Sequence, residues 1–402
     1  MVDPGGERPG GIRGLLMPYP ISTAVLFTIT GAFPLFLTGA YAVRLQDDLD
    51  FGSAELGYAV SAYFILGAIG ANRLGPWIDR FGVSLGLRLA ASHSVVSGLI
   101  IALVATNWQW LAVGLAVAGF GNAFSNLASN RLIAARAGDT RQGVGFGAKQ
   151  AGIPLASLTA GFLVSFLSVD VPWERTYAIF AGVAVVLALV APTFREAGPR
   201  PAQAERGVGD AFRQLFVLAA AGAFGGATGN ALAVFVVDSF ESAGFSEAAS
   251  ARVLGFGSGA AVAARILVGR VIDRRRSGGY PELFMLMAVG VGGFGVLALA
   301  GGNRVVLLIG VMAAFSAAWG WPAVIYYTAV QNTSAPPATT TGFVLTGVFT
   351  GTIFGPPILG LIADNASFEW AWGTAAVMIG VGAALVLASR AIGTQREQAA
   401  AS

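Results

Sequence analysis

The sequence predicts an all-α polytopic membrane protein with twelve transmembrane helices, arranged as two pseudo-symmetric bundles of six. The first reason is composition: 55% of the 402 residues are hydrophobic and only 11% are charged, whereas a soluble domain carries about 25% charged residues to cover its surface. The second is that apolar runs of the ~20 residues needed to cross a bilayer recur along the chain. The third is that motifs of the first half return in the second.

The expected spans are apolar runs bounded by Pro, Gly or charged residues. They cover residues 21–43, 53–74, 84–105, 108–132, 143–167, 174–193, 213–237, 247–271, 282–301, 304–328, 341–363 and 369–390.

Between and around these spans the composition changes. Residues 1–20 are expected to form a cytoplasmic tail, because the apolar run that follows is too long for a signal peptide. Segment 194–212, rich in Pro, Gly and charge, is expected to be a cytoplasmic linker. It separates an N-terminal six-helix bundle (21–193) from a C-terminal one (213–390), and 391–402 is expected to be a second cytoplasmic tail.

Arginine placement sets the expected orientation, because short cytoplasmic loops retain Lys and Arg. With the N-terminus inside the cell, eighteen of the 24 basic residues fall in cytoplasmic segments and four arginines fall on the opposite side. Lys149 and Arg265 remain within the membrane. We therefore expect a multi-pass protein of the plasma membrane with both termini in the cytoplasm.

The repeat between the halves has an offset of 194 residues. Phe51-Gly-Ser-Ala-Glu opens the second span and Phe245-Ser-Glu-Ala-Ala opens the eighth. Without a gap, Gly75-Pro-Trp-Ile-Asp79-Arg80 then aligns with Gly269-Arg-Val-Ile-Asp273-Arg274. A co-linear pair of matches that flanks a whole helix indicates two halves built on one plan.

The first of these runs, Gly-x-x-x-Asp-Arg-x-Gly, resembles the cytoplasmic signature loop of the major facilitator superfamily, and the second lies where that family carries a reduced copy. The resemblance covers essentially the whole chain and implies a secondary transporter. It departs where Val83 and Ser84 replace an expected basic pair. The glycines would let helices approach closely, and the aspartate would accept bonds from a helix N-terminus or an arginine; a plain solvated turn is the alternative. The gating residues implied are Gly75, Asp79, Arg80, Gly82, Gly269, Asp273 and Arg274.

Two cations lie at bilayer depth, where ionisable residues usually mark a pathway or a partner. Lys149, the sole lysine, lies about two turns into the fifth span, beside Gln150 and close to Pro154. A lysine that snorkels to the interface is the alternative. Arg265, four residues before Gly269 in the eighth span, resembles the substrate-binding arginine of monocarboxylate transporters and oxalate–formate exchangers. The chain thereby resembles the monocarboxylate, oxalate–formate and cyanate-permease-like branch of the superfamily. A helix-end arginine that binds headgroups or C-terminal carbonyls is the alternative.

In the superfamily the fifth and eighth helices meet between the halves, so the resemblance implies that Lys149 and Arg265 face one cavity. Two cations at low dielectric repel each other. An anion between them would remove the repulsion and let the halves close, which favours exchange. The predicted ligand is thus a small anion.

Polar and aromatic residues add candidate liners of that cavity. Asn122, Asn126 and Asn130 recur on one face of the fourth span, either to bind substrate or water or to bond a neighbouring helix. The further candidate substrate-binding residues are Gln150, Asn230, Trp319 and Tyr326. His93, the only histidine, is a candidate proton relay, with a structural role as the alternative.

Other classes of protein fit poorly. The chain has no cysteine and one histidine, which argues against a metal site or metalloenzyme, and no Gly-x-x-x-x-Gly-Lys-Ser/Thr loop for ATP. We expect no enzyme, no cofactor and no nucleic-acid partner, and a protein that acts as a monomer in the lipid bilayer. The predicted function is transport of a mono- or dicarboxylate by alternating access, as exchanger or proton-coupled symporter. The rivals are a proton-coupled exporter of drugs or other lipophilic compounds, and a non-transporting substrate sensor.

Overall fold

The computed structural model describes residues 19–136, 142–167, 171–193, 211–275, 277–333 and 337–401, and α-helices make up nearly all of that part of the chain. Each of the twelve expected spans coincides with a helix. The predicted all-α transmembrane fold is therefore confirmed. Residues 1–18 of the expected first tail and 194–210 of the expected linker lie outside the described residues.

The first half of the chain begins with α1 (Tyr19–Ala40), which leads directly into a short helix, α2 (Ala42–Leu49). The expected first span, 21–43, therefore ends early, because the backbone leaves helical geometry at Tyr41 (φ −101°, ψ 18°). The half continues with α3 (Ser53–Phe81), α4 (Val83–Leu103), α5 (Trp108–Arg136), α6 (Gln142–Phe166) and α7 (Trp173–Val190).

The second half repeats this order of long helices. Its last helix runs on to Ala401, past residue 390, so the part of the expected C-terminal tail that the structure describes is helical. The helices are α8 (Phe212–Ser242), α9 (Glu247–Arg275), α10 (Tyr280–Leu299), α11 (Arg304–Gln331), α12 (Pro337–Asn365) and α13 (Phe368–Ala401).

Eleven helices within the described ranges are long and apolar enough to cross a membrane. The twelfth expected span, α6, is 25 residues long and packs against α1 and α9. It falls short in apolar character because its first third carries Gln142, Lys149 and Gln150.

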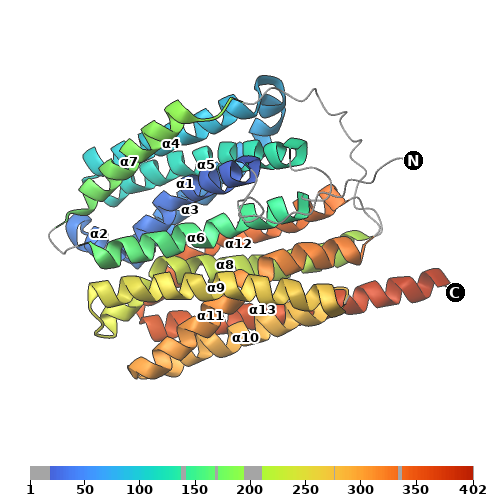
Figure 1. Cartoon of the computed structure of the whole chain (residues 1–402). Coiled ribbons are helices and arrows are strands. Elements are labelled where there is room, and N and C mark those ends of the chain that lie inside the picture. Colours follow the sequence, from blue (N-terminus) through green and yellow to red (C-terminus); the bar gives the residue numbers. More distant parts are fainter. Residues whose placement is uncertain are drawn as a thin grey trace, which may run out of the picture.

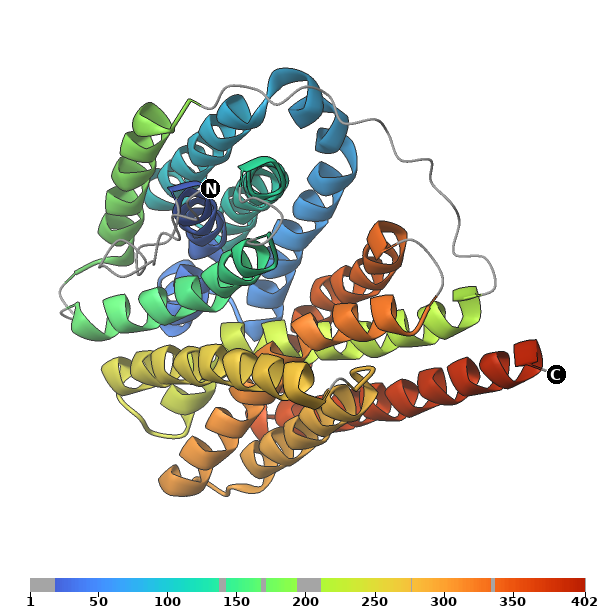
Figure 2. The same ribbon diagram turned by 45° about the vertical axis from the view of Figure 1, so that its right-hand side comes forward.

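Figure 1 shows the halves as two stacked bundles, with α6 and α9 side by side where they meet. The start of α1 and the end of α13 lie at the same end of the molecule, which we call the Tyr19 end. The opposite end carries α2 and is called the Arg44 end. Figure 2 shows that long helices of both bundles run between the two ends.

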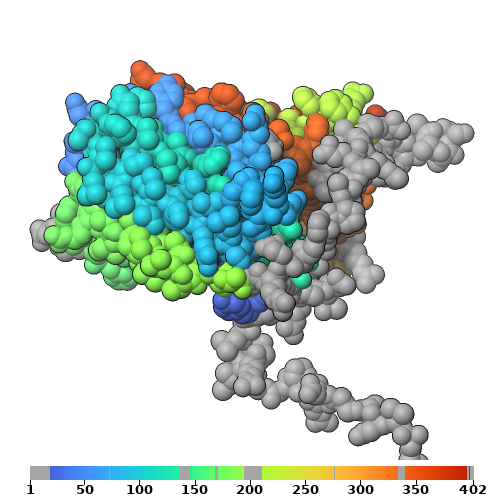
Figure 3. Space-filling model, turned by 90° about the horizontal axis from the view of Figure 1, so that it is seen from above, coloured from blue at the N-terminus to red at the C-terminus, as the bar shows by residue number. Residues whose placement is uncertain are grey.

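The outer surface suits lipid. In the space-filling view of Figure 3, α4, α5 and α7 form one face of the first half. Large apolar side chains of α7 point outward there, including Ile179, Val186 and Leu189, which are 61%, 56% and 77% exposed. Since no water-soluble protein leaves so many neighbouring apolar side chains uncovered, this face is expected to contact hydrocarbon.

Candidate functional site

The halves meet mainly through two pairs of helices, α3 with α12 and α6 with α9, with a smaller contact of α1 and α2 on α8. Toward the Arg44 end both pairs are in direct backbone contact, which only glycine permits. A Cβ at Gly57 would lie 2.7 Å from the backbone of Pro356, and one at Gly161 would lie 2.6 Å from the nitrogen of Gly255. Gly360 lies equally tightly against the carbonyl of Ser53. The interface is therefore closed at this end.

The same four helices are apart at the Tyr19 end. A Cβ added at Gly75, Gly147, Gly269 or Gly342, one on each helix, would meet no atom within 4 Å. Open space at one glycine on each of the four helices, two of which (Gly75 and Gly269) correspond in the repeat, favours halves that separate toward this end. A bundle pair closed at one end and open at the other is the geometry of one alternating-access state.

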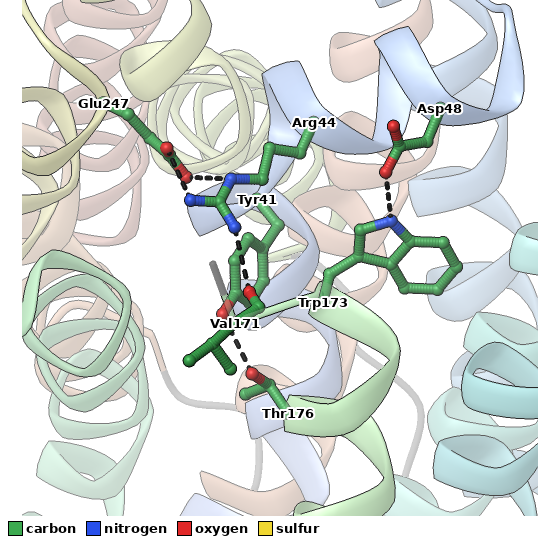
Figure 4. Close-up of polar contacts among 7 residues, drawn as sticks. All are labelled: Tyr41, Arg44, Asp48, Val171, Trp173, Thr176 and Glu247. Carbon is green, nitrogen blue, oxygen red and sulfur yellow. Dashed lines mark hydrogen bonds and ion pairs between the residues drawn. The ribbon is translucent and has the colours of Figure 1, made fainter. Parts of the chain in front are cut away.

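Side chains reinforce the closed end. Arg44 of α2 forms an ion pair with Glu247 at the start of α9, with Nη2 donating to Oε2 at 2.7 Å, and it also donates to the carbonyl of Val171 at 3.0 Å. Figure 4 shows this pair beside the bond from Trp173 Nε1 to Asp48 Oδ2, 2.7 Å long. Arg44 thus joins the first half to the second.

Two carboxylates of the second half also hold the first half. Asp238 accepts bonds from Gln46 Nε2 at 3.0 Å and from Ser53 Oγ at 2.8 Å. Asp364 accepts the backbone N–H groups of Ser53 and Ala54 at 2.9 and 2.7 Å. Because helix N-termini leave unsatisfied N–H groups, Asp364 caps α3 from the opposite half.

Lys149 lies inside the first half. Its side chain is 3% exposed, and Nζ donates to Asn126 Oδ1 at 2.6 Å and Asn130 Oδ1 at 2.9 Å. Two asparagines of the predicted polar face of α5 therefore bond a neighbouring helix, which was one of the two roles left open for that face. Asn122 does not bond Lys149 directly; its backbone carbonyl accepts a hydrogen bond from Asn126 Nδ2 at 2.9 Å.

Arg265 of α9 reaches across the interface. Its Nη1 donates to the backbone carbonyl of Gln150 on α6 at 2.8 Å, and its Nε donates to the carbonyl of Trp319 on α11. The arginine therefore contacts the residue that follows Lys149. The two cations share one part of the interface, but the ammonium turns into α5 while the guanidinium spans the halves.

The other expected liners lie on the second half. Tyr326 is on α11, the helix whose Trp319 carbonyl accepts from Arg265. The Trp319 ring packs 5.6 Å from that of Phe36, which joins α11 to α1, and its buried indole nitrogen lacks a partner among the described residues. Asn230 is half-buried and donates to the carbonyl of Gly226 at 3.1 Å.

Apart from Gly75, the signature residues of the first half make local contacts, whereas those of the second half are exposed or without close neighbours. Asp79 forms an ion pair with Arg131 of α5, as expected for an arginine on a facing element, and Arg80 lies over the Phe81 ring at 5.2 Å. Gly82 ends α3 with φ 94°, a conformation that favours glycine. Gly75 and Gly269 make no close helix contact in this state. Asp273 and Arg274 are exposed.

His93 lies within the first half, away from the other half. Its Nδ1 pairs with the carbonyl of Leu89 one turn back at 2.7 Å, and its ring lies between those of Phe120 and Phe124 at 5.6 and 5.4 Å. These contacts favour the structural role over the proton relay.

Sequence reasoning missed the residues that close the Arg44 end, namely Arg44, Asp238, Glu247 and Asp364. Each was placed near a helix end, where a charged side chain is ordinary. The sequence did carry one signal for these contacts: the segments expected at this end hold many acidic residues and only four arginines, so the arginines there are surrounded by possible partners.

Comparison with known proteins identifies the family to which this architecture belongs. The profile described as Major Facilitator Superfamily matches residues 21–342. The chain belongs to the major facilitator superfamily. No curated protein matches the sequence of this facilitator. Its family makes it a transporter rather than an enzyme.

Among solved structures, the fold is similar to that of a bacterial homolog of the human lysosomal transporter Spinster, in an inward-facing and unoccupied conformation. The TM-score is 0.76 at 15% identity, covering 94% of this chain and 97% of that one. A D-xylose–proton symporter aligns with TM-score 0.73 at 15% identity, over 92% and 96% of the two chains. The nucleoside transporter NupG aligns with 0.71 at 16%, over 93% and 98%. At these identities the likeness concerns the fold alone.

Proposed function

We propose that this facilitator carries a small organic anion, a mono- or dicarboxylate, across the plasma membrane by alternating access. The observation that supports this is Arg265 at the interface, bound to the carbonyl of the residue that follows the buried Lys149. Among the residues described, the ion pairs are Arg44–Glu247 and Asp79–Arg131. Lys149 and Arg265 therefore have only neutral oxygens as partners. A carboxylate is the natural counter-charge.

Both cations have N–H groups that are not used in hydrogen bonds to the described residues and that could bind a ligand. An ammonium has three N–H groups and a guanidinium five. In the described part of the chain Lys149 and Arg265 each donate two hydrogen bonds. Arginine binds carboxylates in a bidentate fork that lysine does not reproduce. Arg265 is thus the proposed anchor of the carboxylate, and Lys149 supplies further positive potential from the first half.

Sidedness follows from the distribution of arginine. The Tyr19 end carries most basic residues, so it is assigned to the cytoplasm by the positive-inside rule. The open interface then faces inward and the Arg44 end closes the outer side. With no carboxylate to neutralise the cations, the empty carrier would close poorly at the Tyr19 end, which favours exchange over free efflux.

Carboxylate binding can be tested on purified protein by thermal shift with acetate, oxalate and succinate. Lys149→Met and Arg265→Met are expected to weaken stabilisation by about 10- to 100-fold in apparent affinity, because hydrogen bonds to charged groups contribute ~1.5–3 kcal/mol. Arg390→Gln, which removes an exposed cation of α13, is the matched control for net charge. Stabilisation by lipophilic cations alone would support the exporter instead.

Transport itself is measured in reconstituted vesicles. Efflux of labelled oxalate should require a carboxylate on the opposite side if the carrier exchanges anions. Undiminished efflux into anion-free buffer would exclude obligatory exchange.

A further inference from the structure

Pro154 leaves one backbone carbonyl of α6 without its helical partner. In an α-helix the N–H of each residue bonds the carbonyl four residues earlier, and proline has no N–H. The carbonyl that Pro154 cannot serve is that of Gln150. Helix α6 nevertheless continues from Gln142 to Phe166, so this carbonyl, on an exposed residue of an intact span, needs a donor from another part of the protein or from water.

The missing donor comes from the other half of the molecule. Arg265 Nη1 donates to the Gln150 carbonyl at 2.8 Å. The bond is therefore a substitute for the one that Pro154 removes. It lies on the Tyr19 side of the bond between Ser258 Oγ and Ser157 Oγ, 2.8 Å long, which also joins α9 to α6. Within the described residues, Arg265 makes the polar contact between α6 and α9 that lies nearest the open end.

The pseudo-symmetric interface repeats the arrangement with a neutral donor. Pro357 of α12, the counterpart of Pro154 in the Gly-x-Pro repeat, cannot serve the carbonyl of Ile353. Ser61 Oγ of α3, again from the opposite half, donates to that carbonyl and shares its one proton with the carbonyl of Gly57 in its own helix. Two prolines at equivalent positions thus each leave a carbonyl that a side chain of the other half satisfies. The interfaces differ in that one donor is a hydroxyl and the other is a guanidinium.

We propose that the Gln150 carbonyl is an internal competitor for the substrate: it holds Arg265 in the empty carrier, and a bound anion displaces it. An ionised carboxylate makes stronger bonds to a guanidinium than a neutral carbonyl does. Displacement removes an inter-half bond between α6 and α9 and leaves the Gln150 carbonyl to water. Anion binding therefore loosens the closed outer interface, which couples occupancy to the change of state. The displacement step rests on the proposed function, whereas the tether itself does not.

The tether can be tested without any anion by a double-mutant cycle. Pro154→Ala restores the helical N–H, so the carbonyl no longer needs Arg265. Arg265→Met is then expected to lower the Tm by about 2–4 °C in the parent protein, and by much less in the Pro154→Ala background. The matched control is Pro357→Ala, where Arg265→Met should have its full effect. Equal losses in all three backgrounds would overturn the tether. If Arg265→Met does not fold, Arg265→Lys provides the second variant of the cycle.

Displacement is tested with sodium oxalate as the probe. Pro154→Ala is expected to bind oxalate about tenfold more tightly than the parent, because the competing carbonyl has been removed, and Pro357→Ala should bind it as the parent does. Unchanged or weaker binding by Pro154→Ala, with oxalate still bound by the parent, would overturn displacement and leave the proposed function intact. Oxalate, acetate and succinate failing on every variant would overturn the proposed substrate class, and with it displacement, while the anion-free cycle would still decide the tether.

Discussion

Replacement of Gly57 by alanine is predicted to open the outer interface. The glycine lies on α3 where that helix meets α12, and an added Cβ would stand 2.7 Å from both the carbonyl group of Pro356 and the Cα of Pro357. Both neighbours are backbone, so neither can rotate away. The clash exists only while the halves are closed at the Arg44 end, and the substitution therefore raises the free energy of this state and not of the opposite one.

The size of the effect follows from the overlap. Overpacking by a methyl group in a well-packed interface costs ~1–3 kcal/mol. Since 1.4 kcal/mol is a factor of ten in an equilibrium constant, the population open at the Arg44 end should rise about 5- to 150-fold. Gly75→Ala on the same helix is the matched control, because its Cβ meets no atom within 4 Å in this state.

The absence of cysteine makes the assay direct. Ser157→Cys introduces a single thiol on α6 at a position that is 1% exposed and faces Ser258 across the interface. A maleimide can reach this thiol only when α6 and α9 separate. Labelling should accelerate in the Gly57→Ala background and not in the Gly75→Ala background. Equal labelling rates in both, with both proteins folded, would refute the reasoning that the Arg44 end is a closed gate.

Three further substitutions test single contacts. Asp364→Ala removes the cap on α3 and, at ~1 kcal/mol for a lost cap, should speed labelling of the same thiol about fivefold; no acceleration would show that the cap does not hold the gate. Arg131→Gln should lower the unfolding free energy by no more than ~1 kcal/mol, because the side chain of its partner Asp79 is 69% exposed; a larger loss in thermal unfolding would contradict this. His93→Gln should leave the pH profile of oxalate exchange unchanged, since the ring is held by its own helix and two phenylalanines; a shifted profile would restore the proton-relay hypothesis.

Most of the fold was predictable because bilayer thickness sets the length of an apolar helix whatever packs against it. The places where the helices begin or end differently from the apolar runs were not predictable. The break at Tyr41 escaped prediction since the apolar run continues through it to Val43. The short α2 that follows is amphipathic, with Leu45 and Leu49 buried. Likewise the alanine-rich end of α13 reads as a tail by hydropathy, yet alanine is the best helix former.

The site was predictable in its composition and less so in its pairing. Lys149 and Arg265 stood out because charges are rare at bilayer depth, and the periodicity of α5 placed its asparagines on one face. Which helix that face meets depends on tertiary packing, and the structure directs Asn126 toward Lys149. The contact of Arg265 with Gln150 was hidden for another reason: it uses a backbone carbonyl, whose availability depends on the proline four residues later.

The two interfaces between the halves now explain how a nearly symmetric scaffold acquires a directional ligand response. Both use a proline to free a carbonyl inside a span, and both satisfy it from the opposite half. Ser61 has one hydroxyl proton and no charge, so an anion gains little by competing for it, and the α3–α12 contact should be insensitive to substrate. Arg265 carries a full charge that carbonyls do not neutralise, so an anion binds the guanidinium more strongly than the Gln150 carbonyl does and displaces it. Substrate occupancy is therefore expected to act on α6 and α9, while α3 and α12 serve as the hinge side of the same movement.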